Sequence, residues 1–249
     1  KAGASALAQK ATLTLAGATQ ESKEYDIYAA EAVVANSTIK VDGQSFIAGA
    51  DITVTVTLKD KASNPLVGED SATLKGFVTV HGATLKGDWL ELEPDGTYQA
   101  TYTATLAGTT HKAVLTLGSE HKDSATYTIA AGEPAAVKST IELDKASYVA
   151  GANMVVTVEL KDAYGNPVSG KVAALTTAAV NVSGAASQSV SWVEVEQDGT
   201  YQANYTATLA GTTHKATLTL GDGHKDSATY TIAASSAVAA TSTITMGGG

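Results

Sequence analysis

Residues 96–131 read GTYQATYTATLAGTTHKAVLTLGSEHKDSATYTIAA, and residues 199–234 repeat them as GTYQANYTATLAGTTHKATLTLGDGHKDSATYTIAA. The two copies are offset by 103 residues and agree at all but four of their 36 positions. Because the offset is about the length of one small domain, the repeat predicts tandem copies of a module rather than the short units of a solenoid. The four differing pairs are Thr101/Asn204, Val114/Thr217, Ser119/Asp222 and Glu120/Gly223.

The repeat divides the 249 residues into two whole modules and two partial ones. We expect module one over residues 36–131 and module two over residues 138–234. Residues 1–33 align with the closing part of a module, so we expect the C-terminal strands of a truncated preceding module there. Residues 238–249 repeat the start of a module and end in possible tag residues. The aligned strand segments near the N-terminus are residues 11–15 and 25–27.

Apolar and polar residues alternate strictly over the early part of each module. This period of two predicts half-buried strands, and Asn-Pro and Asp-Gly turns separate them. The copies diverge in one segment only, residues 66–88 in module one and residues 168–191 in module two, where strands are only weakly indicated. The residues expected to face inward are Ile52, Val54, Val56 and Leu58 in module one, and Met154, Val156, Val158 and Leu160 in module two.

Composition supports the same fold class. Thr, Ala and Val dominate while aromatic residues make up only 6% of the chain, a balance that favours strands. About seven short strands per module, with no helical period, predict an all-β fold of tandem immunoglobulin-like antiparallel β-sandwiches. The linker at residues 130–137 is short and contains Pro134. We therefore expect the sandwiches to be arranged end to end as an elongated rod.

The charge and cysteine content exclude several function classes. The net charge is −9, and all 16 basic residues are lysine. Without arginine or a basic patch, we expect no nucleic-acid partner. The chain contains no cysteine, so disulfides and thiolate catalysis are excluded. No stretch approaches the roughly 20 apolar residues of a membrane span, and we expect no membrane insertion by this segment.

Two pairs of aromatic residues recur at equivalent positions. Tyr98 and Tyr201 follow an Asp-Gly turn and resemble the start of a tyrosine corner, so we expect both to be structural. Trp89 and Trp192 alternate with apolar neighbours, and strict alternation would leave them on the outer face of the sheet. There they would serve a partner or interdomain contact, unless a bulge or the divergent loop covers them.

The histidines and turn carboxylates are the candidate metal ligands. A histidine site would need His111 to meet His121 and Asp123 across a hairpin, but the adjacent lysines disfavour a cation and predict solvated histidines. Asp60 and Asn64, and their counterparts in module two, could contribute to a calcium site, yet the Asp-rich loop of a dedicated site is missing. Turn capping is the better interpretation, and we expect no metal site. The five histidines are His81, His111, His121, His214 and His224.

Paired carboxylates are the candidate catalytic residues. Glu91 and Glu93 lie two apart on one strand and recur as Glu194 and Glu196. Such a pair can catalyse glycosidic cleavage, but a catalytic constellation is rarely intact in every copy of a repeat. Solvent-facing carboxylates are the better interpretation. We therefore expect no catalytic residues, no cofactor and no enzymatic activity.

Two motifs carry a resemblance to a known family. V-x-V-x-L-K-D-x-x-x-N-P occurs at residues 54–65 and 156–167, and D-G-x-Y-x-A-x-Y-T-A-T-x-A-G at residues 95–108 and 198–211. Together they resemble the group 1 bacterial immunoglobulin-like (Big-1) domains, the repeating passenger domains of the intimin/invasin adhesins (inverse autotransporters). The resemblance covers both modules and the flanking pieces, and the modules look most like those of long intimin-like adhesins of enteric bacteria.

The resemblance implies an extracellular segment of a bacterial outer-membrane adhesin that presents, or contributes to, attachment to host cells or matrix. It further implies exposure on the bacterial surface, a role in virulence, host cell-surface or matrix proteins as partners, and a parent chain anchored by an outer-membrane barrel. Two alternatives stay open. One is a purely structural spacer for a binding or catalytic domain elsewhere in the parent chain, and the other is a polysaccharide-binding module.

Overall fold

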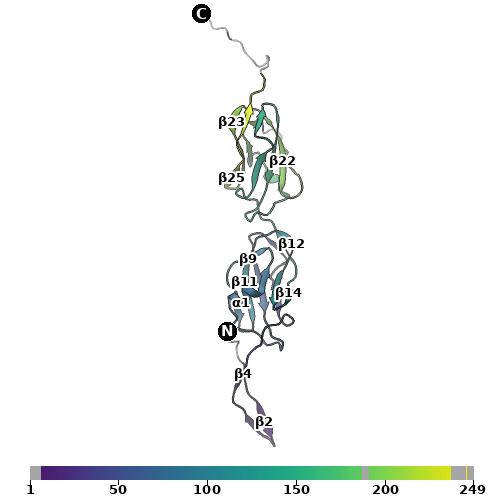
Figure 1. Ribbon diagram of the computed structural model, residues 1–249, viewed down its shortest axis with the longest axis vertical. Coiled ribbons are helices and arrows are strands. Elements are labelled where there is room, and N and C mark those ends of the chain that lie inside the picture. Colours follow the sequence, from purple (N-terminus) through teal and green to yellow (C-terminus); the bar gives the residue numbers. More distant parts are fainter. Residues whose placement is uncertain (1–6, 187–190, 237–244, 246–249) are drawn as a thin grey trace. The chain divides into compact units, whose positions relative to one another are not determined.

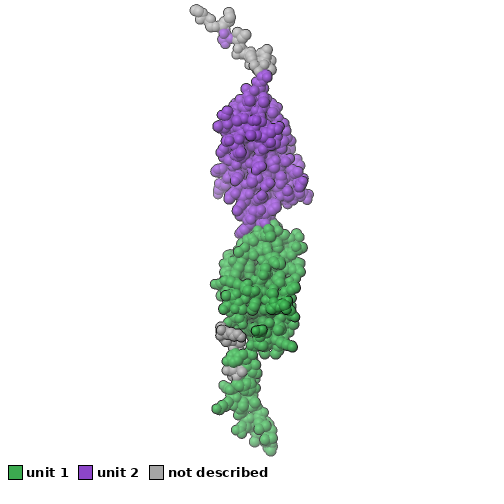
Figure 2. Space-filling model, in the orientation of Figure 1, with its two compact units in different colours: residues 1–130 green, residues 131–249 purple. Residues whose placement is uncertain are grey.

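The structure, a computed structural model, describes residues 7–186, 191–236 and 245 (Figure 1). The chain divides into two compact units (Figure 2). Unit one comprises residues 1–130 and unit two comprises residues 131–249.

The module boundaries expected from the repeat, residues 36–131 and 138–234, stay predictions, as does the rod-like arrangement. The start of a further module, expected at residues 238–249, lies outside the described residues except for Thr245. Within each unit, one cluster of buried hydrophobic residues forms the core.

Unit one contains a β-sandwich. One sheet has the strand order β10-β11-β7-β5, with β9 also paired to β11. Two three-stranded sheets, β12-β15-β6 and β14-β13-β8, contribute to the same core cluster. The elements are β5 (Thr38–Val41), β6 (Ser45–Ile47), β7 (Asp51–Thr57), α1 (Ser71–Phe77), β8 (Val78–Val80), β9 (Ala83–Leu85), β10 (Leu90–Glu93), β11 (Thr97–Ala104), β12 (Gly108–His111), β13 (Ala113–Leu117), β14 (Glu120–Asp123) and β15 (Tyr127–Ala130).

Unit two repeats this topology. Its larger sheet has the order β16-β18-β22-β20, with β21 also paired to β22, and its smaller sheets are β17-β26-β23 and β19-β24-β25. The elements are β16 (Thr140–Leu143), β17 (Ser147–Val149), β18 (Asn153–Glu159), the 3-10 helix η1 (Val172–Ala174), β19 (Val180–Val182), β20 (Ala185–Ala186), β21 (Val193–Glu194), β22 (Thr200–Ala207), β23 (Gly211–His214), β24 (Ala216–Leu220), β25 (Gly223–Asp226) and β26 (Tyr230–Ala233).

The predicted alternation is confirmed in both units. Every residue expected to face inward is fully buried, from Ile52 to Leu58 in unit one and from Met154 to Leu160 in unit two. Between them lie mostly threonines, which are partly exposed. Successive side chains of a strand point to opposite faces, so this pattern buries one face and leaves the other to water. The all-β, immunoglobulin-like sandwich class is therefore confirmed.

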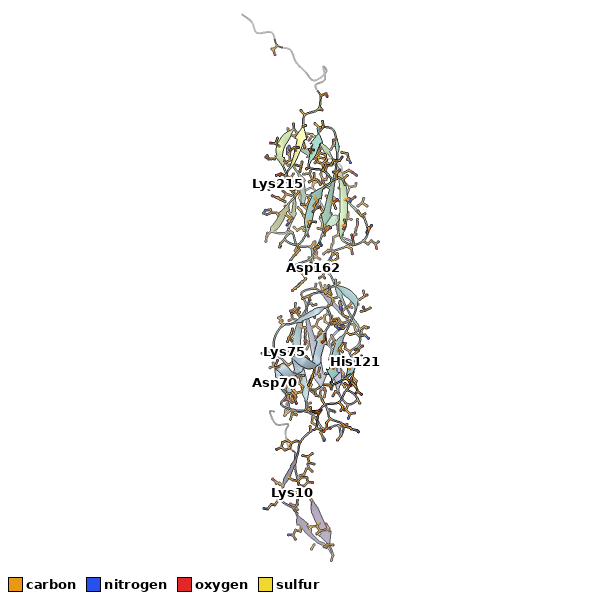
Figure 3. The ribbon with its side chains drawn as sticks, viewed as in Figure 1. Lys10, Asp70, Lys75, His121, Asp162 and Lys215 are labelled. Carbon is orange, nitrogen blue, oxygen red and sulfur yellow. The ribbon has the colours of Figure 1, made fainter. Side chains whose placement is uncertain are left out.

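Two details of the fold differ from the expectation. One strand pair in each unit is parallel, β6 with β15 and β17 with β26, so the sandwiches are not purely antiparallel. Unit one also contains the short helix α1, although the sequence shows no helical period. Asp70 caps this helix by accepting a hydrogen bond from the Thr73 amide at 2.7 Å (Figure 3). Seven residues with one buried side chain, Leu74, are too few to reveal a period of 3.6.

The N-terminal segment forms four short strands, of which the sequence predicts two. They are joined into two antiparallel pairs, β1 with β4 and β2 with β3. The segments missed by sequence reasoning are β1 and β3, and β3 is mostly polar, with the sequence ATQE. The bounds are β1 (Leu7–Gln9), β2 (Thr12–Leu15), β3 (Ala18–Glu21) and β4 (Tyr25–Ile27).

A buried carboxylate fixes the start of unit two to its body. Asp162 accepts hydrogen bonds from the amide of Gly132, from the amides of Tyr164 and Asn166, and from the side chain of Asn166, each at 2.9 Å (Figure 3). The Ala135 amide adds a bond to the Lys161 carbonyl at 2.8 Å. Residues 132–135, expected as part of a linker, therefore pack as part of unit two.

This attachment predicts which fragment of unit two is the most stable. Residues 131–234 should unfold cooperatively, without any change on adding EDTA. A fragment of residues 138–234 should be less stable by about 1–3 kcal/mol, because it loses the Gly132 donor and the buried Ala136 side chain. Urea-unfolding midpoints of the two fragments measure the difference.

The matched control is Glu133→Ala in the longer fragment, which removes only an exposed partner of Lys171. That change should shift stability by less than about 1 kcal/mol. Equal midpoints for the two fragments would show that residues 131–137 do not contribute to the fold.

Candidate functional site

The most distinctive polar arrangement in each unit is a buried tyrosine that holds the divergent segment. The Tyr98 hydroxyl, from β11, donates to the Leu66 carbonyl at 2.7 Å and accepts from the Glu69 amide at 3.1 Å. In unit two, Tyr201 from β22 bonds the Val168 carbonyl and the Lys171 amide, both at 2.9 Å. Both rings are buried in the core. The hydroxyls therefore join the central strand to the segment in which the copies differ.

This geometry corrects the tyrosine-corner interpretation. In a tyrosine corner the hydroxyl bonds the backbone a few residues upstream. Here the partner of Tyr98 lies 32 residues upstream and that of Tyr201 lies 33 upstream. The inward-pointing ring reaches across the end of the sandwich to the segment that follows β7 or β18, and not to its own turn.

A glutamate on the neighbouring strand completes the anchor. The Glu91 carboxylate accepts from the Gly68 amide at 2.8 Å and from the Gly96 amide at 3.3 Å. Glu194 repeats both contacts, with the Gly170 amide at 2.9 Å and the Gly199 amide at 3.2 Å. We call each tyrosine–glutamate pair, Tyr98 with Glu91 and Tyr201 with Glu194, a loop anchor.

Sequence reasoning missed this role for Glu91 and Glu194, which it weighed as catalytic carboxylates and preferred as solvent-facing ones. A register shift between Glu91 and Glu93 breaks the strand geometry that would have put both on one face, and Glu93 is exposed. The signal that could have found the anchor is repetition. Glu91 and Gly68 recur as Glu194 and Gly170 although the segment around the glycines has diverged.

The turn glycine of each anchor cannot be replaced without strain. Gly96 has a φ of +76°, and a Cβ atom there would lie 2.8 Å from the Leu58 carbonyl oxygen. Gly199 has a φ of +83° and the same close approach to the Leu160 carbonyl, at 2.9 Å. Only glycine adopts this backbone without a steric penalty.

The segments held by the two anchors have different structures. In unit one, residues 66–88 include α1, and Lys75 and Ser71 both bond the exposed Asp88 carboxylate, at 2.7 and 3.1 Å (Figure 3). In unit two, the equivalent part forms η1, and Lys171 pairs with Glu133 at 2.9 Å. Thus one anchor geometry supports two different surfaces.

Both tryptophans lie in the cores, so the outer-face position that strict alternation would give is wrong, and the alternative, a covered position, is the one observed. Trp89 is 4% exposed and Trp192 is 8% exposed, each in edge-to-face contact with a tyrosine of the central strand. Burial still alternates along both segments, but the face that carries the tryptophan and the following glutamate is the inner one. The neighbours expected inside are exposed instead: Leu90, Leu92, Val193 and Val195.

The histidines do not form a metal site in the part of the chain that the structure describes, where no group of three suitable ligands occurs. His214 is buried rather than solvated. Its Nδ1 lies 2.9 Å from the Ser183 hydroxyl, and its ring stacks on Tyr230 at a centroid distance of 5.7 Å. His111 packs similarly on Tyr127. Asp123 pairs with Lys112 at 2.8 Å, which neutralises the carboxylate that a metal would need.

The sequence of this chain is similar to a known repeat family and to a bacterial adhesin. Residues 131–230 match the Filamin/ABP280 repeat family. The chain is 30% identical over 195 residues to the inverse autotransporter adhesin YeeJ of Escherichia coli (strain K12). The match covers 77% of this chain but only 8% of that relative. The resemblance to intimin/invasin-type adhesin passengers is confirmed.

A solved structure of the Escherichia coli adhesin FdeC is also similar, with 23% identity and a TM-score of 0.46 over 84% of this chain and 67% of that chain. The intimin/invasin-like relative and the repeat family suggest a protein that is not an enzyme. Among the described residues, no helix is long and apolar enough to span a membrane.

The loop anchor predicts the cost of removing one hydroxyl. Tyr201→Phe should destabilise unit two by about 1–3 kcal/mol, because the Val168 carbonyl and the Lys171 amide lose a buried partner. Tyr98→Phe should act alike in unit one. Tyr164→Phe is the matched control, since its ring is 45% exposed. Denaturant midpoints that are the same for all three variants and the parent chain would contradict the anchor.

Buried tyrosines also predict loss of stability at alkaline pH. Burial raises the pKa of Tyr98, Tyr127 and Tyr230 to about 12 each. The pKa in the unfolded chain is about 10, so the folded state holds these protons more tightly. The stability that they contribute is complete below about pH 10 and is lost as the pH rises through 12. Urea midpoints measured between pH 8 and 12 test this decline, which should be smaller for Tyr230→Phe.

The buried Asp162 predicts the opposite dependence of stability on pH, with a loss at acidic rather than alkaline pH. Burial opposes its ionisation, but hydrogen bonds from Asn166, Gly132 and Tyr164 outweigh that effect and hold the pKa of Asp162 below its usual value. A lowered folded pKa gives stability that is complete above the unfolded pKa of about 4 and is lost as the pH falls. A midpoint of unit two that is constant from pH 7 to pH 2 would contradict this role.

Proposed function

We propose that this chain is an extracellular segment of a bacterial outer-membrane adhesin, whose Big-1-like modules contribute contacts to host-cell or matrix proteins. The observation that carries the proposal is the 30% identity to an inverse autotransporter adhesin over 195 residues. It supports an adhesin-like role and exposure at the bacterial surface. The chain spans only 8% of that relative, so anchoring in the outer membrane and a role in virulence belong to the whole protein and to this proposal.

The loop anchors support a role in presenting contact surfaces. The divergent segment meets the Tyr98 hydroxyl and the Glu91 carboxylate through main-chain atoms of Leu66, Gly68 and Glu69. In unit two the main chain of Val168, Gly170 and Lys171 meets Tyr201 and Glu194 in the same way. Main-chain partners are present whatever the side chains are, so the divergent segments can change sequence without losing the anchor. Loops positioned by a rigid scaffold commonly carry binding residues.

The charge distribution favours protein partners over nucleic acid or anionic glycans. The net charge is −9 and the chain has no arginine, so electrostatic attraction to an anionic ligand is weak. The two tryptophans are buried and supply no aromatic platform for a polysaccharide. Attachment should therefore depend only weakly on salt.

Segment replacement tests the proposal. One variant carries residues 168–191 in both modules, and a second carries residues 66–88 in both. Beads coated with each chain are then tested for attachment to epithelial cells and to matrix proteins. At least one variant should lose most of the attachment of the parent chain, because one of the two surfaces is missing.

The control exchanges Ser119-Glu120 with Asp222-Gly223, positions that differ between the copies but lie outside the divergent segments. Circular dichroism and thermal melts establish that every variant is folded. If both variants attach as the parent does, the segments are not the contact surface. If the folded parent chain does not attach at all, this chain is a spacer and adhesion lies elsewhere in the longer protein.

A further inference from the structure

The N-terminal ribbon, which we define as residues 7–28, exposes apolar side chains that globular proteins ordinarily bury. Leu13 is 60% exposed, Leu15 67%, Tyr25 48% and Ile27 51%. A two-stranded ribbon is marginally stable in water without a partner layer. An exposed apolar group of this kind on a strand pair marks an interaction surface.

The ribbon has the hydrogen-bonding register of the closing strands of unit one. β2 pairs with β3 so that Thr12 faces Glu21 and Leu15 faces Ala18. Adding 102 to each number gives the register of β13 with β14, where Val114 faces Asp123 and Leu117 faces Glu120. The pair β1 and β4 matches at one end, where Gln9 faces Tyr25 as His111 faces Tyr127. At the other end Leu7 faces Ile27, whereas a register shift in unit one puts Gly108 opposite Ile129.

Side-chain hydrogen bonds repeat at the same offset. The Ser22 hydroxyl accepts from the Ala11 amide at 2.9 Å and donates to the Lys23 carbonyl at 2.7 Å. Ser124 makes the equivalent two bonds, with the Ala113 amide at 3.0 Å and the Ala125 carbonyl at 2.7 Å. The ribbon is therefore a structural copy of β12 to β15, and not a hairpin of another kind.

What covers these strands in unit one is known. β8 pairs with β13 and β6 pairs with β15, and both belong to the opening half of the module, residues 36–108. In that setting the counterparts of Leu13, Tyr25 and Ile27 are buried, with Leu115 0% exposed, Tyr127 1% and Ile129 2%. Leu117, the counterpart of Leu15, is partly buried against the same core. Among the described residues, the ribbon has no strand equivalent to β6 or β8.

We propose that the ribbon is the closing half of a third immunoglobulin-like module, and that its apolar face binds an opening half of the same type lying N-terminal to it in the same polypeptide. The strand equivalent to β8 pairs along β2, and the strand equivalent to β6 pairs in parallel along β4. Leu13, Leu15, Tyr25 and Ile27 then enter a core like that of unit one.

A second copy of this chain is a poorer occupant. The opening halves of both units already hold their own closing strands, through β13 and β15 in unit one and β24 and β26 in unit two. A ribbon from another copy would have to displace strands that belong to the same chain, which have the higher effective concentration. Two copies that each carry a net charge of −9 also repel.

The absence of cysteine from the sequence provides the experiment. A single cysteine is introduced by Leu13→Cys, on the exposed apolar face, or by Thr14→Cys, on the opposite face, as the matched control. Residues 36–108 are then fused ahead of Leu7 in place of residues 1–6, which restores the chain order of a complete module. The rate of reaction with a thiol reagent is measured with and without the fusion.

The fusion should slow labelling at position 13 by about tenfold or more, since a buried thiol reacts only during local opening, and leave position 14 nearly unchanged. Leu15→Cys serves as a second inward position should Leu13→Cys prevent assembly. Labelling at positions 13 and 15 that stays fast in the fusion would overturn the proposal. Protection in the unfused chain that grows with its own concentration would identify a second copy as the occupant and would equally overturn it.

Discussion

The pairing of two long strands at the centre of each sandwich is the constraint on which the rest depends. β7 and β11 pair over seven residues, from Thr57 opposite Thr97 to Asp51 opposite Thr103, and β18 and β22 pair over the same length. Side chains alternate with a period of two, so a slip of one residue would turn the whole apolar set to solvent. The register is thus fixed by burial, and it determines where each neighbouring strand lies and where the tyrosine at one end of the central strand points.

How far the fold could be predicted from the sequence depends on whether that alternation holds. It holds from Ile52 to Leu58 and from Met154 to Leu160, and there the predicted faces are correct. From Trp89 to Leu92 burial also alternates, but Trp89 and Glu91 lie on the inner side while Leu90 and Leu92 are exposed, so the predicted face is wrong there. Both faces carry apolar residues in this stretch, so hydrophobicity alone does not identify the inner one. The helix α1 escaped prediction for a related reason, since it depends on one cap and one buried leucine.

The loop anchor shows a second limit on what can be predicted from the sequence. That Tyr98 is buried could be predicted from its place in the alternating pattern, whereas its partners could not. The Leu66 carbonyl and the Glu69 amide are main-chain atoms about 30 residues away, brought close only by tertiary folding. Any residue type can supply a main-chain acceptor, so no sequence motif identifies the residue that does. The same holds for the carboxylate of Glu91, which reasoning from side-chain chemistry assigned to catalysis or solvent.

Contacts to main-chain atoms also explain why the two modules differ where they do. Residues 96–131 are nearly identical to residues 199–234, and the buried members of both copies fill the cores, so changes at those buried positions would cost stability. In the segment held by the tyrosine and the glutamate, Leu74, Val78 and Val80 also fill the core, and only the exposed positions are free of that restriction. The segment contains a helix in one unit and a 3-10 turn in the other. The N-terminal ribbon corresponds only to β12 through β15. It therefore has no counterpart of Tyr98, of Glu91 or of the divergent segment, because all three belong to the opening half of a module. An opening half that binds the ribbon contributes both the missing core layer and a third variable segment. The same binding step therefore completes the fold and adds a contact surface.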